Sequence, residues 1–130
     1  MSALVPSAAT MWRVGALSGA SSVLLGAFGA HALKARLGEG SPLLATWATA
    51  AQYHLVHSGA ILIAAGAARQ HQQLRPAGGG PATAAAFFAA GTLLFSGSLY
   101  ALVLTGEKRL GAVTPIGGVL LTAGWLALLL

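Results

Sequence analysis

The sequence contains no cysteine, and of its 130 residues only two are acidic and seven are lysine or arginine. Without cysteine the chain can form no disulfide, thiolate nucleophile, iron–sulfur cluster or cysteine-ligated zinc site. Charged residues make up 7% of the chain, against about 25% in an ordinary soluble domain, and cannot cover the surface of a water-soluble fold. Seven cations are also too few for a phosphate-binding surface. These shortages exclude a soluble globular domain, a disordered chain and a nucleic-acid-binding module.

The uncharged segments set the expected architecture. Hydrophobic residues make up 56% of the chain. The charged residues are separated by four uncharged runs, which are residues 14–33, 40–68, 76–106 and 110–130. A membrane-spanning helix needs about 20 apolar residues, because each residue rises about 1.5 Å across a hydrocarbon core about 30 Å thick. Each run is long enough for one span. The sequence therefore predicts an all-α integral membrane protein, a four-helix bundle with both termini on the same side.

The expected boundaries follow from these runs and from helix-breaking residues. The chain should form a single membrane domain of residues 1–130, with helices near residues 11–33, 46–68, 82–104 and 111–130. Residues 69–81 contain three glutamines, three glycines and two prolines, and they should form an aqueous loop. The lysines and arginines divide three to four between the two sides, so the orientation in the membrane does not follow from charge.

Aromatic residues lie near the ends of the expected helices. Trp12 and Trp125 should lie at one membrane surface, and Trp47 and Tyr100 at the other. Aromatic rings at both surfaces are typical of the interfacial belt of a membrane protein. The positions of these residues therefore support the four spans.

Small residues recur at a spacing of four in the first expected helix. Gly15 and Gly19 form one such pair, and Ser22, Gly26 and Ala30 continue the pattern. Faces of this kind let helix backbones approach closely, where van der Waals contact drives association in a membrane. This face could pack within the bundle or against a partner protein.

Histidines are the main candidates for chemistry, because no acidic residue lies inside an expected helix. His54 and His57 are three residues apart and share one helix face, with Tyr53 at its edge, while His31 lies near the end of the first helix. These groups could hydrogen-bond across helices and fix the packing, bind a metal or haem, or carry protons or gate a substrate. The packing interpretation is preferred, because a carboxylate partner is missing and His31 lies nearer the membrane surface than His57.

The third and fourth expected helices contribute hydroxyl groups. Ser96, Ser98 and Tyr100 lie near the end of the third helix. A serine in a membrane helix usually bonds a carbonyl of its own helix or of a neighbour, so a structural role is expected. Thr114 and Pro115 have the residue types of an N-cap and a first helical position, so the fourth helix should start there or slightly earlier.

Three motifs, which follow one another along the chain, resemble those of a known family. They are Gly-Ala-Phe-Gly-Ala-His-Ala-Leu at residues 26–33, Leu-Phe-Ser-Gly-Ser-Leu-Tyr at residues 94–100, and Thr-Pro-Ile-Gly-Gly at residues 114–118. They resemble the motifs of the first, third and fourth helices in domain-of-unknown-function family 423. The likeness covers nearly all of residues 14–130, and it adds Gly117 and Gly118 to the candidate packing residues.

The second helix departs from the pattern of this family. The family's helix opens with an acidic and a basic residue and ends in histidine. Tyr53 and His57 keep the pattern here. Ala48 and Gln52 stand in place of the charges, and His54 stands where glutamine is usual. Any ion pair of the family is therefore lost at this place, and His57 matches the motif while His54 does not.

The resemblance implies a four-helix membrane protein and supplies no activity. We expect a non-enzymatic accessory or structural subunit of a larger membrane complex, with membrane lipids and other membrane subunits as partners and no nucleic acid. The resemblance favours a respiratory assembly of the mitochondrial inner membrane, with a bacterial inner membrane as the alternative. No catalytic residue, metal or cofactor is expected, apart from a bound lipid. The alternative functions are a small carrier or channel using His31, His54 and His57, and a haem- or metal-binding electron carrier.

Overall fold

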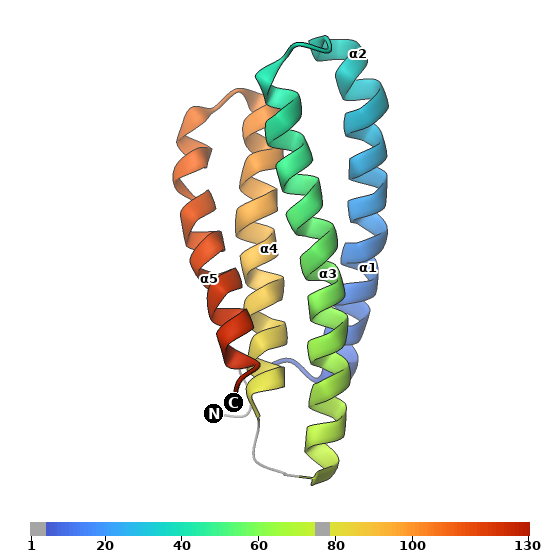
Figure 1. Ribbon diagram of the computed structural model, residues 1–130, viewed down its shortest axis with the longest axis vertical. Helices are drawn as coiled ribbons and strands as arrows, with labels where there is room; N and C mark the ends of the chain where they lie inside the picture. Colours follow the sequence, from blue (N-terminus) through green and yellow to red (C-terminus); the bar gives the residue numbers. More distant parts are fainter. Residues whose placement is uncertain (1–4, 75–78) are drawn as a thin grey trace.

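A computed structural model describes residues 5–74 and 79–130, and this part of the chain folds as a bundle of four long helical rods. Figure 1 shows the rods side by side, with the start of α1 and the end of α5 at the same end of the bundle. The elements are α1 (Ala8–Phe28), a π-helical turn (Gly29–Leu33), α2 (Lys34–Leu37), α3 (Pro42–Leu74), α4 (Gly80–Thr105), a 3-10 turn (Lys108–Ala112) and α5 (Thr114–Ala127). The predicted all-α four-helix bundle is confirmed.

The first rod is longer than predicted at both ends. It begins at Ala8 because the hydroxyl of Ser7 accepts a hydrogen bond from the backbone N–H of Thr10 and caps the helix. It runs without a break through the π-helical turn to Leu37, and it ends where Gly38 takes a positive φ of 84°. The predicted end at residue 33 was wrong because Lys34–Leu37 contains no helix breaker.

Three of the described rods are long and apolar enough to cross a membrane, namely Ala8–Leu37, Gly80–Thr105 and Lys108–Ala127. The sequence predicted four such rods. At 33 residues, or about 50 Å, α3 is long enough to span. The polar side chains of Gln52, His54 and His57 lower its mean hydropathy. Since α3 packs between α1 and α4, His54 and His57 are covered by protein rather than by lipid.

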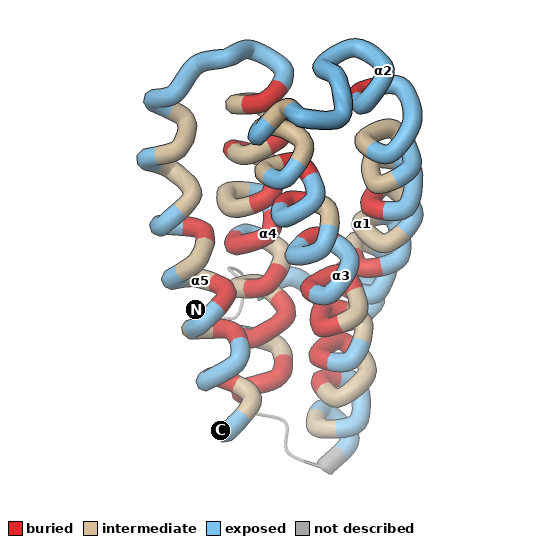
Figure 2. The backbone as a smooth tube through the Cα atoms, turned by 45° about the horizontal axis from the view of Figure 1, so that its top comes forward, coloured by how far each residue is buried: buried red, intermediate tan, exposed pale blue. Residues whose placement is uncertain are grey.

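Each long helix packs mainly against the long helix that precedes or follows it in the chain. α1 packs mainly against α3, α3 against α4, and α4 against α5, while α1 and α4 make few contacts. Figure 1 shows the same order across the bundle. Figure 2 shows buried residues concentrated on the facing sides of α3 and α4, whereas much of α1 is exposed. This arrangement leaves one groove between α1 and α4, over α3, and another between α3 and α5, over α4.

Glycines allow the closest approach between α4 and α5. A Cβ atom at Gly117 would collide with the backbone of Phe95, and one at Gly124 would collide with the Phe88 ring. In the first rod, Gly15 lies against Leu62. A Cβ at Gly26 would meet nothing within 4 Å, so the upper part of the predicted small-residue face does not pack inside the bundle.

The aqueous loop predicted over residues 69–81 is shorter than expected. Residues 69–74 continue α3, and Gly80 and Pro81 begin α4; residues 75–78 lie outside the described part. Polar side chains without a glycine or proline do not end a helix, and proline is favourable in the first turn of the next one.

The last helix starts where the sequence predicts, but its first residues are capped differently. Val113 occupies the N-cap position, and Thr114 is the first helical residue, with no side-chain cap. The Thr114 hydroxyl is instead 2.6 Å from that of Ser98 on α4. The 3-10 turn before α5 supplies the extra length that the span needs.

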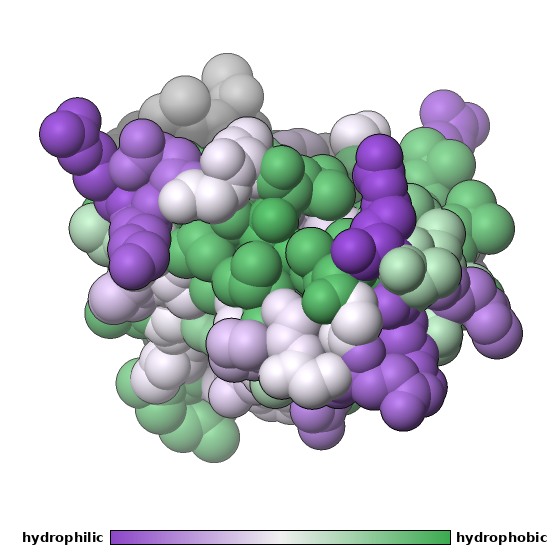
Figure 3. All heavy atoms as spheres, turned by 90° about the horizontal axis from the view of Figure 1, so that it is seen from above, coloured by the Kyte–Doolittle hydropathy of each residue, from purple (hydrophilic) through white to green (hydrophobic). Residues whose placement is uncertain are grey.

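Charged side chains lie at the ends of the rods. Looking down on the end that carries α2, Figure 3 shows hydrophilic residues gathered at two sides, with hydrophobic residues between them. Lys34 and Glu39 form an exposed ion pair at 2.8 Å. Such a surface pair contributes little stability, so these charges mainly mark where the protein leaves the hydrocarbon core.

Candidate polar sites inside the bundle

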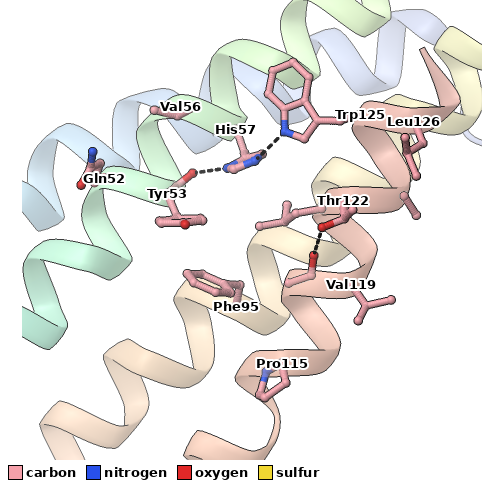
Figure 4. Close-up of a pocket in the computed structure, with 13 residues that line it drawn as sticks. Gln52, Tyr53, Val56, His57, Phe95, Pro115, Val119, Thr122, Trp125 and Leu126 are labelled. Atoms are coloured by element: carbon pink, nitrogen blue, oxygen red, sulfur yellow. Dashed lines mark hydrogen bonds between the residues drawn. The ribbon is translucent and has the colours of Figure 1, made fainter. Parts of the chain in front are cut away.

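His57 lies at the floor of the groove between α3 and α5, and it is 5% exposed. Its Nδ1 is 2.8 Å from the carbonyl oxygen of Tyr53, and its Nε2 is 3.1 Å from the indole nitrogen of Trp125 on α5 (Figure 4). A carbonyl can only accept a hydrogen bond and an indole N–H can only donate one. These partners assign the neutral tautomer with the proton on Nδ1. Both ring nitrogens are occupied, so neither is free to bind a metal or haem iron.

Aromatic rings build the wall of this groove, which we call the α3/α5 groove. Tyr53 stacks on Phe95 of α4 with ring centroids 4.4 Å apart, and on His57 at 5.7 Å. Trp125 meets Phe88 edge to face at 5.0 Å. The groove has a volume of about 880 Å³, and Pro115, Gly118 and Thr122 of α5 line it as well. Figure 4 shows Tyr53, Phe95 and His57 around the same opening.

His54 faces the opposite groove, between α1 and α4. Its Nδ1 is 3.1 Å from the hydroxyl of Tyr100 on α4, and its Nε2 is 3.4 Å from that of Ser21 on α1. Ser21 already donates its proton to the carbonyl of Ser18. Ser21 must therefore accept from His54 Nε2–H, which leaves Nδ1 to accept from Tyr100. His54 and His57 are thus assigned opposite tautomers.

Serine hydroxyls connect α3 to both α1 and α4. Ser58 donates to the carbonyl of His54 at 2.6 Å, so the Ser18 hydroxyl on α1 must be the donor in its 2.6 Å contact with Ser58. On the other side of α3, Ser96 of α4 donates to the carbonyl of Ala50 at 2.8 Å. The Ser18–Ser58 and Ser96–Ala50 bonds run between helices, whereas the Ser58–His54 bond lies within α3.

Two residues assigned to the aromatic belt are buried in the bundle. Trp47 is 2% exposed, and its indole N–H donates to the carbonyl of Leu25 at 2.8 Å. The ring fits there because Gly29 has no side chain in its way. Tyr100 is 9% exposed and lies against Trp47 at a centroid distance of 4.6 Å. Both rings therefore pack within the bundle, where each finds a polar partner.

The other two belt candidates remain near the opposite end. Trp12 and Trp125 are each 47% exposed. The indole nitrogen of Trp125 is nevertheless directed to His57, a link that the sequence analysis missed. Spacing within a single helix carries no signal for a pair 68 residues apart in the chain.

His31 is not brought to the other histidines. It lies in the π-helical turn of the first rod and is exposed, while His54 and His57 are buried in different grooves. Within residues 5–74 and 79–130, no three His, Asp or Glu side chains form a group that could hold a metal ion. A site made of all three histidines is therefore absent from the described structure.

The sequence pattern of a family described as "protein of unknown function (DUF423)" matches residues 25–118. This chain belongs to that family. The matched segment includes the π-helical turn, both buried histidines and the close contact of Gly117 with Phe95. The family resemblance of the three sequence motifs is thus confirmed.

Relatives in this family occur in bacteria and in a yeast. A UPF0382 membrane protein of Staphylococcus haemolyticus is 39% identical over 90% of this chain and 89% of its own length. One of Schizosaccharomyces pombe is 36% identical over 92% of this chain and 98% of its own. The UPF0382 inner membrane protein YgdD of Escherichia coli is 39% identical over 88% and 82%. No solved structure matches the chain. This protein is therefore an integral membrane member of a family whose names assign no activity.

Proposed function

We propose that this family member is a non-enzymatic accessory subunit that packs against another protein in the membrane. The observation that carries the proposal is a stripe along the outer side of the first rod. It consists of small exposed side chains with three- and four-residue spacing, namely Ala16, Ala20, Val23, Ala27 and Ala30. We call this set the outer stripe. No described helix of the chain covers it, and small side chains of this spacing favour close contact between membrane helices.

The outer stripe shares only Ala30 with the small-residue face that the sequence suggested. Gly15 and Ser22 turn inward toward the bundle and are buried. The exposed residues of the rod lie on its other side. Small side chains therefore serve two sides of one helix, the inner side for folding and the outer side for the proposed partner.

The buried polar groups also support a non-enzymatic role without a cofactor. Both nitrogens of His57 and Nδ1 of His54 are bonded to partners in the same chain, and Nε2 of His54 carries a proton in its long contact with Ser21. A haem or metal carrier would need one of them free. A proton carrier or channel based on three histidines has less support, because His31 is exposed whereas His54 and His57 are buried in different grooves.

The proposal extends to the host assembly and its compartment. The family resemblance favours a respiratory complex of the mitochondrial inner membrane, with a bacterial inner membrane as the alternative. The Escherichia coli relative is called an inner membrane protein, which agrees with the second setting.

Purification from native membranes tests the accessory role. A tagged chain extracted in mild detergent should migrate well above its own mass of 12.9 kDa and bring defined partner subunits with it. Ala20→Trp or Ala27→Trp should release the partners, because the indole blocks close helix contact. Ile63→Trp, at a 69% exposed position on α3, is the matched control and should keep them. An isolated wild-type monomer, or partners retained by both stripe variants, would contradict the proposal.

A further inference from the structure

The groove between α1 and α4, which we call the α1/α4 groove, contains a polar group that the fold leaves without a partner. Among the described residues, Thr92 Oγ1 is the buried side-chain oxygen or nitrogen atom with no hydrogen bond. Thr92 is 7% exposed and lines this groove together with Ser21 and His54. Leaving a buried hydroxyl unpaired costs about 1–3 kcal/mol, so the position is unfavourable unless something else pairs with it.

Other hydroxyls of the membrane helices show what is unusual about Thr92. Thr122 on α5 donates to the carbonyl of Gly118 in its own helix at 2.9 Å, as membrane threonines commonly do. Ser96, one turn after Thr92, donates across to Ala50. Thr92 does neither, although its neighbours on the same face of α4 line the groove with it.

We propose that the α1/α4 groove binds an apolar molecule carrying a ring carbonyl, with the chemistry of an isoprenoid quinone. The groove supplies hydrogen-bond donors that lack a good acceptor. The Thr92 hydroxyl has none, and His54 Nε2–H reaches Ser21 only at 3.4 Å. A carbonyl oxygen is the complement of these donors, because it accepts and cannot donate.

The depth of Thr92 in the membrane argues against an ordinary phospholipid as the ligand. Twelve residues of α4 precede Thr92 and thirteen follow it, which places it roughly 18–20 Å from either end of the helix. The carbonyl at this depth must therefore belong to a molecule without a charged headgroup. A charged group is strongly disfavoured at the centre of a bilayer.

The size and lining of the groove suit a small apolar molecule. α1 and α4 make only a few close backbone contacts, which leaves space between them above α3. A flat ring with an isoprenoid chain is a molecule of this kind. The groove volume of about 810 Å³ is in the range of small-molecule sites. Its walls are apolar side chains such as Val14, Leu17 and Leu93.

Saturable binding to the purified chain tests the proposal. The probe is a tritiated benzoquinone with a ten-carbon alkyl chain, added to the full-length protein in phosphatidylcholine nanodiscs. Wild type should bind it saturably, and Thr92→Val should weaken the affinity about fivefold, the effect of one ordinary hydrogen bond. Thr122→Val makes the same substitution on another helix, outside the groove, and should leave the affinity unchanged.

A second pair of variants tests where the probe binds rather than which hydrogen bond it makes. Leu93 is 73% exposed at the groove, and Leu93→Trp should block entry of the ring. Leu104→Trp, at a 57% exposed position of the same helix outside the groove, should not. An azido form of the probe should label α1 or α4 peptides that line the groove.

Four outcomes would overturn the proposal. They are the absence of saturable binding, equal affinity in Thr92→Val and wild type, unchanged binding in Leu93→Trp, and labelling confined to the α3/α5 groove. Cross-linking of a photoreactive residue at Leu93 to a partner helix in native membranes, without saturable binding, would assign the groove to a protein instead. The binding assay uses the isolated chain, so its result does not depend on the accessory role proposed above.

Discussion

Trp125 of α5 donates its indole N–H to Nε2 of His57 on α3 at 3.1 Å, and so connects two helices that are not packed directly against each other. The bond crosses the α3/α5 groove and holds α5 in place from a second side. It also keeps His57 as a hydrogen-bond acceptor at Nε2.

The energy of this bond can be measured with a double-mutant cycle. Trp125→Phe and His57→Phe should each destabilise the bundle, and the coupling between them should be about 1 kcal/mol, within the range of side-chain hydrogen bonds in membrane proteins. Reversible unfolding in mixed micelles measures the four free energies. His31→Phe, at an exposed position, should change the stability little. A coupling near zero would mean that the bond contributes nothing to folding.

The two buried histidines should show opposite tautomers. The partners assign the proton of His57 to Nδ1 and that of His54 to Nε2. Nitrogen-15 NMR of the labelled protein in nanodiscs distinguishes a protonated from an unprotonated ring nitrogen. Trp125→Phe should change the Nε2 signal of His57 and leave His54 as it was. Identical tautomers at both sites would disprove these assignments.

Close packing between α4 and α5 should make Gly117 intolerant of a side chain. Gly117→Ala places a Cβ against the Phe95 backbone, which cannot move without shifting α4. The expected loss is about 1–3 kcal/mol in the unfolding free energy. Gly26→Ala is the matched control, because its Cβ meets nothing within 4 Å. It should be neutral or stabilise by up to about 1 kcal/mol through helix propensity. Equal effects of the two variants would refute this account of α4–α5 packing.

Thr92→Val should stabilise the ligand-free protein. The substitution replaces an unpaired buried hydroxyl with a methyl group of similar size, and the expected gain is about 1 kcal/mol. Ser96→Ala should have the opposite effect, since it removes the bond to the Ala50 carbonyl. The same unfolding assay, run on protein stripped of lipid-soluble ligands, compares them. A Thr92→Val variant less stable than wild type would show that the hydroxyl has a partner within the fold.

The sequence predicts the number and order of the helices because charged residues are excluded from a bilayer centre. The positions of nine charges were enough for that. The sequence does not predict which helices touch, since small residues occur on more than one side of the first rod. Trp47 illustrates the difficulty, because its position near a helix end suggested the membrane surface. Its ring instead packs inside the bundle, where it fits against Gly29 and donates to the carbonyl of Leu25.

The polar sites were predictable only in part. The three-residue spacing predicted that His54 and His57 share one helix face, but it did not indicate that they face two separate grooves. Their partners Ser21, Tyr100 and Trp125 come from three other helices. Such contacts depend on helix rotation and tilt. Packing determines both, and neither can be predicted from hydropathy.

The central position of α3 bears on how the protein enters the membrane. α3 is the one rod, among those described, that lacks the apolarity for a span of its own, and its polar side chains bond residues of α1, α4 and α5. Two of these helices are synthesised after it. During translation α3 therefore leaves the ribosome before its partners Tyr100 and Trp125 exist. The inter-helix hydrogen bonds of α3 can be complete only when the C-terminal half of the chain has arrived.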